Sequence, residues 1–117
     1  MGVGTWTINA CPMDGGGLLY TNGHFISAWR RNDDVFLSTP DRPETRIGAG
    51  VDIALADSGG QPFVAWQKSG KVIVWRDGQT VILAAKDGGF PALVDLPGGG
   101  VLAAWEAGGM ISTRRVP

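Results

Sequence analysis

Three tryptophans recur at nearly constant spacing, and this repeat narrows the folds open to the chain. Trp29, Trp66 and Trp105 each follow an alanine and lie 37 and 39 residues apart. A second apolar run is under way about six residues after each tryptophan, and another begins about twelve residues before it. Repeats of this length bury their apolar surface by stacking like units against one another. The sequence therefore predicts a fold made from three copies of one small unit.

The apolar runs have the length and composition of β-strands. They span four to eight residues, are rich in valine, isoleucine, leucine and aromatic residues, and alternate with short turns. The turns carry residues that accept positive φ or fix a bend, at 21–23, 32–33, 40–43, 57–60, 69–70, 77–78, 97–100 and 108–109. Apolar positions never hold a helical period for ten residues. We therefore expect an all-β protein.

Each repeat reads as a meander of four antiparallel strands, a to d, which is the unit of a β-propeller blade. The third repeat ends at Pro117 after its third strand, and residues 5–9 form a lone strand before the first repeat. The predicted order is therefore d-abcd-abcd-abc within one domain, 1–117. Residues 1–10 close the preceding blade, and the three blades are 11–48, 49–85 and 86–117, the last without its outer strand.

Three blades cannot close a ring, because closed propellers have typically four to eight. The lone first strand belongs to the blade behind the first one, which in a two-chain ring is the third blade of the other chain. We therefore expect a homodimeric six-bladed ring with exchanged N-terminal strands. The alternatives are a piece of a longer propeller and a three-chain ring of nine blades.

Charge and composition exclude several function classes. The formal net charge is −1, which gives no general attraction to nucleic acid or to an anionic membrane. Cys11 is the only cysteine, so the sequence predicts neither an internal disulfide nor a cysteine-based zinc site. The N-terminus lacks the pattern of a signal peptide, and no apolar stretch reaches the length of a membrane span. We expect a cytoplasmic protein if the chain is complete; a piece cut from a secreted parent would look the same.

Two stretches resemble blades of bacterial sialidase-like propellers of the BNR type. They are residues 9–16 with the following Leu18-Leu19 and 28–31, and the run 56–66. The resemblance covers nearly the whole chain at the level of single blades. It implies a six-bladed ring and, more loosely, a carbohydrate ligand. The chain departs from the family because no Asp box is present, 57–60 being the nearest segment, and because Tyr20 is the only tyrosine. No catalytic residue is carried over.

Candidate chemistry is sparse. His24 is the only histidine and has no second histidine with which to share a metal, and the glycine-rich segments lack the pattern of a phosphate-binding loop. We predict no metal and no cofactor. The d–a and b–c loops meet on the face where propellers usually bind ligands, and that face is expected to hold Asp14, Arg30, Arg31, Asp33, Lys68, Lys86, Asp87 and Glu106.

These observations favour a non-catalytic binding or scaffold propeller, with lectin-like carbohydrate binding as the expected activity and a second copy of the chain as partner. Two alternatives remain. One is a sialidase-type glycoside hydrolase whose site is completed across the dimer, using two of the carboxylates on the loop face. The other is a fragment of a larger propeller without independent function. The tryptophans of the repeat are predicted to lie in the core, and Trp75 at the partly buried rim.

Overall fold

The structure is a computed structural model that describes residues 16–21, 23–40 and 42–117. Within these ranges the chain folds into eleven β-strands and contains no helix. The strands form three antiparallel sheets of four, four and three strands, each a meander in which consecutive strands pair. The prediction of an all-β protein is confirmed.

The strands follow one another in chain order. The first sheet contains β1 (Gly16–Thr21), β2 (His24–Arg31), β3 (Asp34–Thr39) and β4 (Arg42–Ala49). The second sheet contains β5 (Val51–Ser58), β6 (Gln61–Lys68), β7 (Lys71–Arg76) and β8 (Gln79–Ala84). The third sheet contains β9 (Gly88–Asp95), β10 (Val101–Ala107) and β11 (Met110–Val116).

Two-residue hairpin turns produce the tight meanders. At the β7–β8 turn both central residues adopt positive φ, 50° for Asp77 and 80° for Gly78. The β6–β7 turn repeats this geometry with Ser69 at 52° and Gly70 at 81°. Positive φ at both positions defines the type I′ turn, whose twist matches that of the flanking strands. The sequence therefore places its small and polar residues where the backbone requires them.

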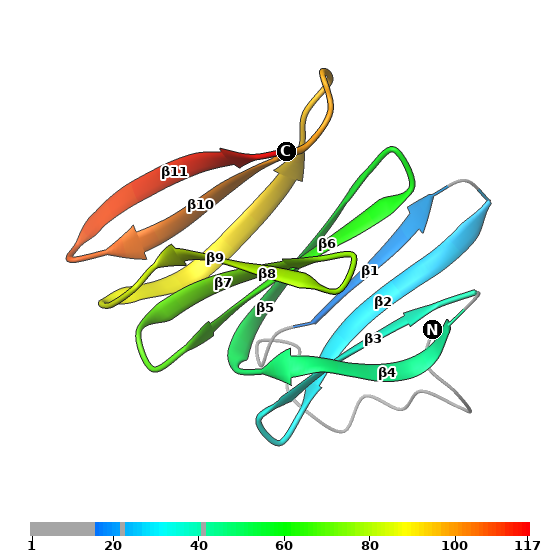
Figure 1. Cartoon of the computed structure of the whole chain (residues 1–117), viewed down its shortest axis with the longest axis horizontal. Helices are drawn as coiled ribbons and strands as arrows, with labels where there is room; N and C mark the ends of the chain where they lie inside the picture. Colours follow the sequence, from blue (N-terminus) through cyan, green and yellow to red (C-terminus); the bar gives the residue numbers. More distant parts are fainter. Residues whose placement is uncertain (1–15, 22, 41) are drawn as a thin grey trace.

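The three sheets lie side by side in chain order, and their first strands are neighbours (Figure 1). β1 contacts β5, and β5 contacts β9, although each of these strands is an edge of its own sheet. The β1–β2, β5–β6 and β9–β10 turns lie at one end, toward the top of Figure 1, and the β2–β3, β6–β7 and β10–β11 turns lie at the other. We call these the upper and lower ends.

The connections between sheets are hydrogen-bonded to the lower turns. The Gly50 amide, between β4 and β5, donates to the Asp33 carbonyl at 2.7 Å. The Gly88 amide, at the start of β9, donates to the Gly70 carbonyl at 2.8 Å. Each chain segment that leaves a sheet is therefore tied to the hairpin turn of the sheet it leaves, which fixes where the next sheet begins.

Two apolar clusters hold the sheets together, one on each face of the second sheet. The cluster between the first and second sheets contains Ile26, Ala28, Val35, Leu37, Ile53, Val64, Trp66 and Trp75. The cluster between the second and third sheets contains Ala56, Phe63, Ala65, Val72, Val74, Val101, Ala103, Trp105 and Val116. Side chains alternate between the two faces of a strand, so one sheet can supply both clusters.

We call the first strand of each sheet (β1, β5 and β9) its inner strand. The inner strands of the second and third sheets begin earlier than the sequence predicts. β5 starts at Val51 and β9 at Gly88, whereas the apolar runs begin at 54 and 92. Asp52 and Phe90 adopt φ of 56° and 50°, and the strand register shifts beside each of them. A β-bulge lets a strand continue past an irregular residue, so the inner strands extend beyond their apolar runs. The amide of Gln67 donates to the Asp52 carboxylate at 3.1 Å.

Other boundaries shift by a residue or two. Residues 42–43 belong to β4 rather than to the predicted 40–43 turn, and β4 ends at Ala49, one residue past the predicted end of the first blade. The three sheets span residues 16–49, 51–84 and 88–116. Residues 5–9, Cys11 and Asp14 lie outside the described part of the chain.

The tryptophans do not share one environment. Trp66 and Trp105 are buried in the two clusters, as predicted. Trp29 is only half-buried, because its side of the first sheet faces away from the second sheet. The rim prediction for Trp75 is wrong, since this residue is 5% exposed and packs in the cluster between the first two sheets.

Candidate ligand-binding site

The residues predicted to form a ligand-binding face lie at the lower end of the sheets, and only some of them meet. Arg30 and Arg31 end β2, where successive side chains point to opposite faces of the sheet. Arg30 forms an ion pair with Asp33 across the β2–β3 turn, with 3.9 Å between Nη1 and Oδ1. Arg31 pairs instead with Glu44 of β4 at 2.6 Å. The two guanidinium groups therefore do not converge on one ligand.

The remaining residues of this face are distributed over the second and third sheets. Lys68 ends β6 and lies opposite Lys71 across a hairpin turn, and Lys86 and Asp87 lie in the connection from β8 to β9. Glu106 of β10 lies opposite Gly89 of β9. The side chains of all four predicted residues are exposed. They share the lower end of the molecule.

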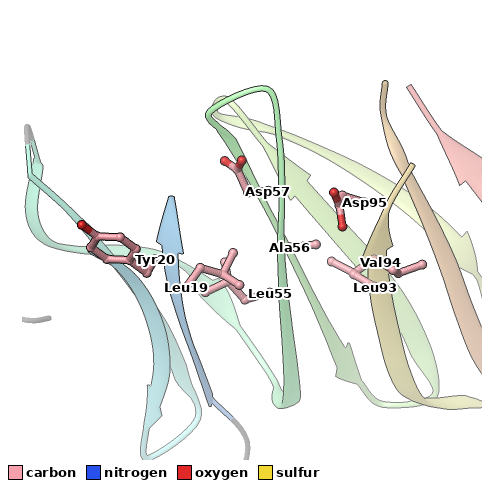
Figure 2. A pocket seen from close by; sticks show the side chains of 8 residues that line it. All are labelled: Leu19, Tyr20, Leu55, Ala56, Asp57, Leu93, Val94 and Asp95. Atoms are coloured by element: carbon pink, nitrogen blue, oxygen red, sulfur yellow. The ribbon is translucent and has the colours of Figure 1, made fainter. Parts of the chain in front are cut away.

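A shallow open cavity of about 280 Å³ lies at the upper end, away from these residues. It is formed by the three inner strands β1, β5 and β9 where they run side by side (Figure 2). Its lining consists of Leu19, Tyr20, Leu55, Ala56, Asp57, Leu93, Val94 and Asp95. Figure 2 places the two carboxylates nearer the hairpin end of the strands than the leucines. The cavity therefore has an apolar floor and a polar rim.

The three polar side chains of the rim occupy one position in three sheets. Tyr20 pairs across the sheet with Phe25, Asp57 with Pro62 and Asp95 with Val101. Each of these partners lies four residues before the tryptophan of its sheet. Because the inner strands are neighbours, matched positions along them are brought to the same height around the cavity.

Local contacts fix the rim. The Tyr20 ring meets the Phe25 ring edge to face, with 4.9 Å between the centroids, while 67% of Tyr20 stays exposed. The Asp57 carboxylate accepts the Gly60 amide at 3.1 Å and so supports the β5–β6 turn.

A further hydrogen bond joins the upper turns of two sheets. The Gly100 amide, in the loop between β9 and β10, donates to the Ser58 hydroxyl at 2.8 Å. Two backbone hydrogen bonds close the same loop. The Leu96 amide donates to the Gly100 carbonyl, and the Gly99 amide donates to the Leu96 carbonyl. The loop that follows Asp95 is thus held in place by hydrogen bonds within the chain.

The cavity favours a neutral polar ligand with an apolar side. Of the described residues that line it, two are acidic and none is basic. Carboxylates accept hydrogen bonds from hydroxyl groups, the Tyr20 phenol both donates and accepts, and the leucine floor offers contact to C–H groups. A sugar ring presents both kinds of surface.

Sequence reasoning placed the candidate site at the opposite end of the sheets. The signal was nevertheless available, because the segments Leu-Leu-Tyr, Leu-Ala-Asp and Leu-Val-Asp precede the first turn of each repeat, ending at Tyr20, Asp57 and Asp95. What the sequence lacked was the information that these three strand ends adjoin one another.

Within the described ranges, no group of three or more histidine, cysteine, aspartate or glutamate side chains is arranged to hold a metal ion. The same ranges contain no helix that is long and apolar enough to cross a membrane. Comparison with known proteins found no matching family model, no matching curated protein and no matching solved structure. The resemblance to sialidase-like propellers therefore remains a prediction from short sequence segments.

Proposed function

We propose that this chain is a non-catalytic binding protein of the β-propeller class that recognises a carbohydrate in the cavity at the upper end of its inner strands. The observation that carries the proposal is the open cavity along β1, β5 and β9, in which Asp57 and Asp95 lie nearer the hairpin ends than the leucines and Tyr20 lines the β1 side. In this reading two chains supply three blades each to a six-bladed ring, and residues 5–9 of each copy provide the fourth strand beside β11 of the other.

The arrangement of the sheets supports the propeller assignment. Three antiparallel meanders pack face to face in chain order, with their first strands adjacent. Blades of a propeller are four-stranded meanders whose first strands line a central axis. The third sheet has three strands, and among the described residues β11 pairs only with β10, which leaves one strand edge open for a donated strand.

The chemistry of the cavity supports a carbohydrate over an anionic ligand. Two carboxylates without a basic lining residue repel phosphate and carboxylate groups, whereas they accept hydrogen bonds from sugar hydroxyls. Tyr20 adds an exposed aromatic surface of the kind that packs against apolar faces of ligands. Closure by a second copy would give each ring two cavities and so strengthen binding to multivalent glycans.

A glycan array probed with the full chain tests this function, followed by titration calorimetry with the strongest ligand. We expect Asp95→Asn to weaken binding by about 10- to 100-fold, which corresponds to the loss of one hydrogen bond to a charged group. Asparagine keeps the shape of aspartate and removes its charge. The matched control is Asp87→Asn at the lower end, which should leave affinity unchanged.

Two results would overturn the proposal. Absence of binding across the array would remove carbohydrate as the ligand class. Binding that is lost on Asp87→Asn or on Arg30→Ala, and retained by Asp95→Asn, would move the site to the lower face that the sequence predicts.

A further inference from the structure

The first and third sheets each expose one face that has no neighbouring sheet among the described residues. The second sheet is covered on both sides, whereas the third covers the second with one face only. On the open face of the third sheet, Val94 is 51% exposed and Ile111 is 72% exposed. On the open face of the first sheet, Leu18 and Phe25 are 48% and 49% exposed. Both open faces thus carry large apolar side chains that are exposed to solvent.

The two sheet-to-sheet contacts within the chain are built from matching positions. We call the face that a sheet turns toward the following sheet its leading face. The leading face of the first sheet consists of Ile26, Ala28, Val35 and Leu37, and that of the second of Phe63, Ala65, Val72 and Val74. Backbone pairing places these residues in register, since Ile26 lies opposite Leu19 and Phe63 opposite Ala56.

The open face of the third sheet is the next leading face in this series. Leu102 lies opposite Val94 just as Phe63 lies opposite Ala56. The residues at the four matching positions are Leu102, Ala104, Ile111 and Thr113. Three of the four are apolar, although no sheet in the described part of the chain covers them. The third sheet therefore retains the surface with which the first two sheets pack onto a neighbour.

The open face of the first sheet is the opposite half of the same contact. We call the face that accepts a leading face the receiving face. In the second and third sheets its centre is Trp66 and Trp105, both buried. Trp29 is the matching residue of the first sheet, and its ring stacks on Phe36 with 6.0 Å between the centroids. The first sheet therefore carries the same receiving face, and no sheet among the described residues covers it.

We propose that the partner of both open faces is a second copy of this chain, in which the leading face of the third sheet packs onto the receiving face of the first sheet of the other copy. The contact continues the two contacts made within the chain and is formed twice in a closed pair. It rests on the proposed two-chain ring and deepens it, because it names the surfaces that close the ring. A head-to-tail contact that closes after two copies leaves no open apolar face.

The series also predicts which residues meet across the new contact. At the upper end of the first contact Leu19 packs beside Leu55, and at the second Ala56 packs beside Leu93 (Figure 2). In the proposed contact between two copies, Val94 of one copy occupies the position that Leu19 has in the first contact and Ala56 has in the second. Leu18 of the second copy takes the place of Leu55 and Leu93, because it lies opposite Ser27 as Leu55 lies opposite Val64.

Complementary charges at this pair give a direct test by light scattering on a sizing column. The unmodified chain should elute at twice its 12.3 kDa mass. Leu18→Glu and Val94→Lys should each weaken association by at least about 100-fold, because each buries an unpaired charge in both contacts of the ring. An equimolar mixture of the two variants should recover the dimer, since one contact of the mixed pair is unmodified and the other joins Glu to Lys.

The matched control is Ile82→Glu, which adds the same charge at a 54% exposed position of β8, outside both open faces. It should leave the mass unchanged, and circular dichroism should show that every variant keeps its β-sheet signal. A dimer that survives Leu18→Glu and Val94→Lys, or a mixture that fails to recover, would overturn this contact. An unmodified chain that elutes as a monomer or as three copies would overturn the two-copy ring as well. The glycan titration uses the unmodified chain, because Val94 also lines the cavity, and a monovalent sugar, so failure of the ligand proposal is read separately from failure of this contact.

Discussion

Replacing Val74 by alanine should lower the free energy of unfolding by about 2–3 kcal/mol. Val74 is 1% exposed and lies in the cluster between the second and third sheets. Removing two methyl groups forfeits about 1.6 kcal/mol of burial at roughly 0.8 kcal/mol each. The vacated space of about 50 Å³ adds about 1 kcal/mol where the neighbouring sheets cannot close over it.

Val81 provides the matched control, because it lies directly opposite Val74 on β8 and is 39% exposed. The same substitution there removes less buried surface and leaves no closed cavity, so its cost should be about 1 kcal/mol or less. Urea unfolding followed by tryptophan fluorescence measures both values. One protein concentration must be used throughout, because association adds to apparent stability. Equal losses for the two variants would refute the assignment of Val74 to a closed core.

Three further substitutions probe separate contacts. Gly48→Ala would push a methyl group into the buried indole of Trp66 and should cost about 1–3 kcal/mol, measured by urea unfolding; an unchanged midpoint would mean that the indole moves freely. Ser58→Ala removes the acceptor for the Gly100 amide and should cost about 0.5–1.5 kcal/mol, with faster hydrogen exchange at that amide as its signature. Arg46→Ala breaks an exposed ion pair of 2.9 Å and should change stability by at most about 1 kcal/mol; a larger loss in thermal melts would contradict a surface role.

The strands and turns were predictable because their signals are local. Alternating apolar residues and type I′ turn residues such as Asp77-Gly78 specify hairpins without reference to the rest of the chain. The bulges at Asp52 and Phe90 were not predicted from the sequence, because a single aspartate or phenylalanine within a strand does not by itself specify a positive φ. The inner strands therefore run further than their apolar runs indicate.

The environments of individual aromatic residues were less predictable. The matching contexts of Trp29 and Trp66 suggest equal burial, yet among the described residues only Trp66 has a second sheet packed on its side. Trp75 precedes a polar turn and reads as a rim residue, but its side chain faces the first sheet and is buried there. A period of two tells which residues share a face, and it does not tell which face meets a neighbour.

The sequence alone determined the all-β class, the four-strand meander and the division into three units, because each depends on residues close together in the chain. Tertiary structure decided which faces are covered and where a ligand could enter. The cavity is lined by Tyr20, Asp57 and Asp95, which follow one another at intervals of 37 and 38 residues and line one cavity only because three strands lie side by side. Such a site arises from the packing of whole sheets, so no local pattern of residues encodes its position.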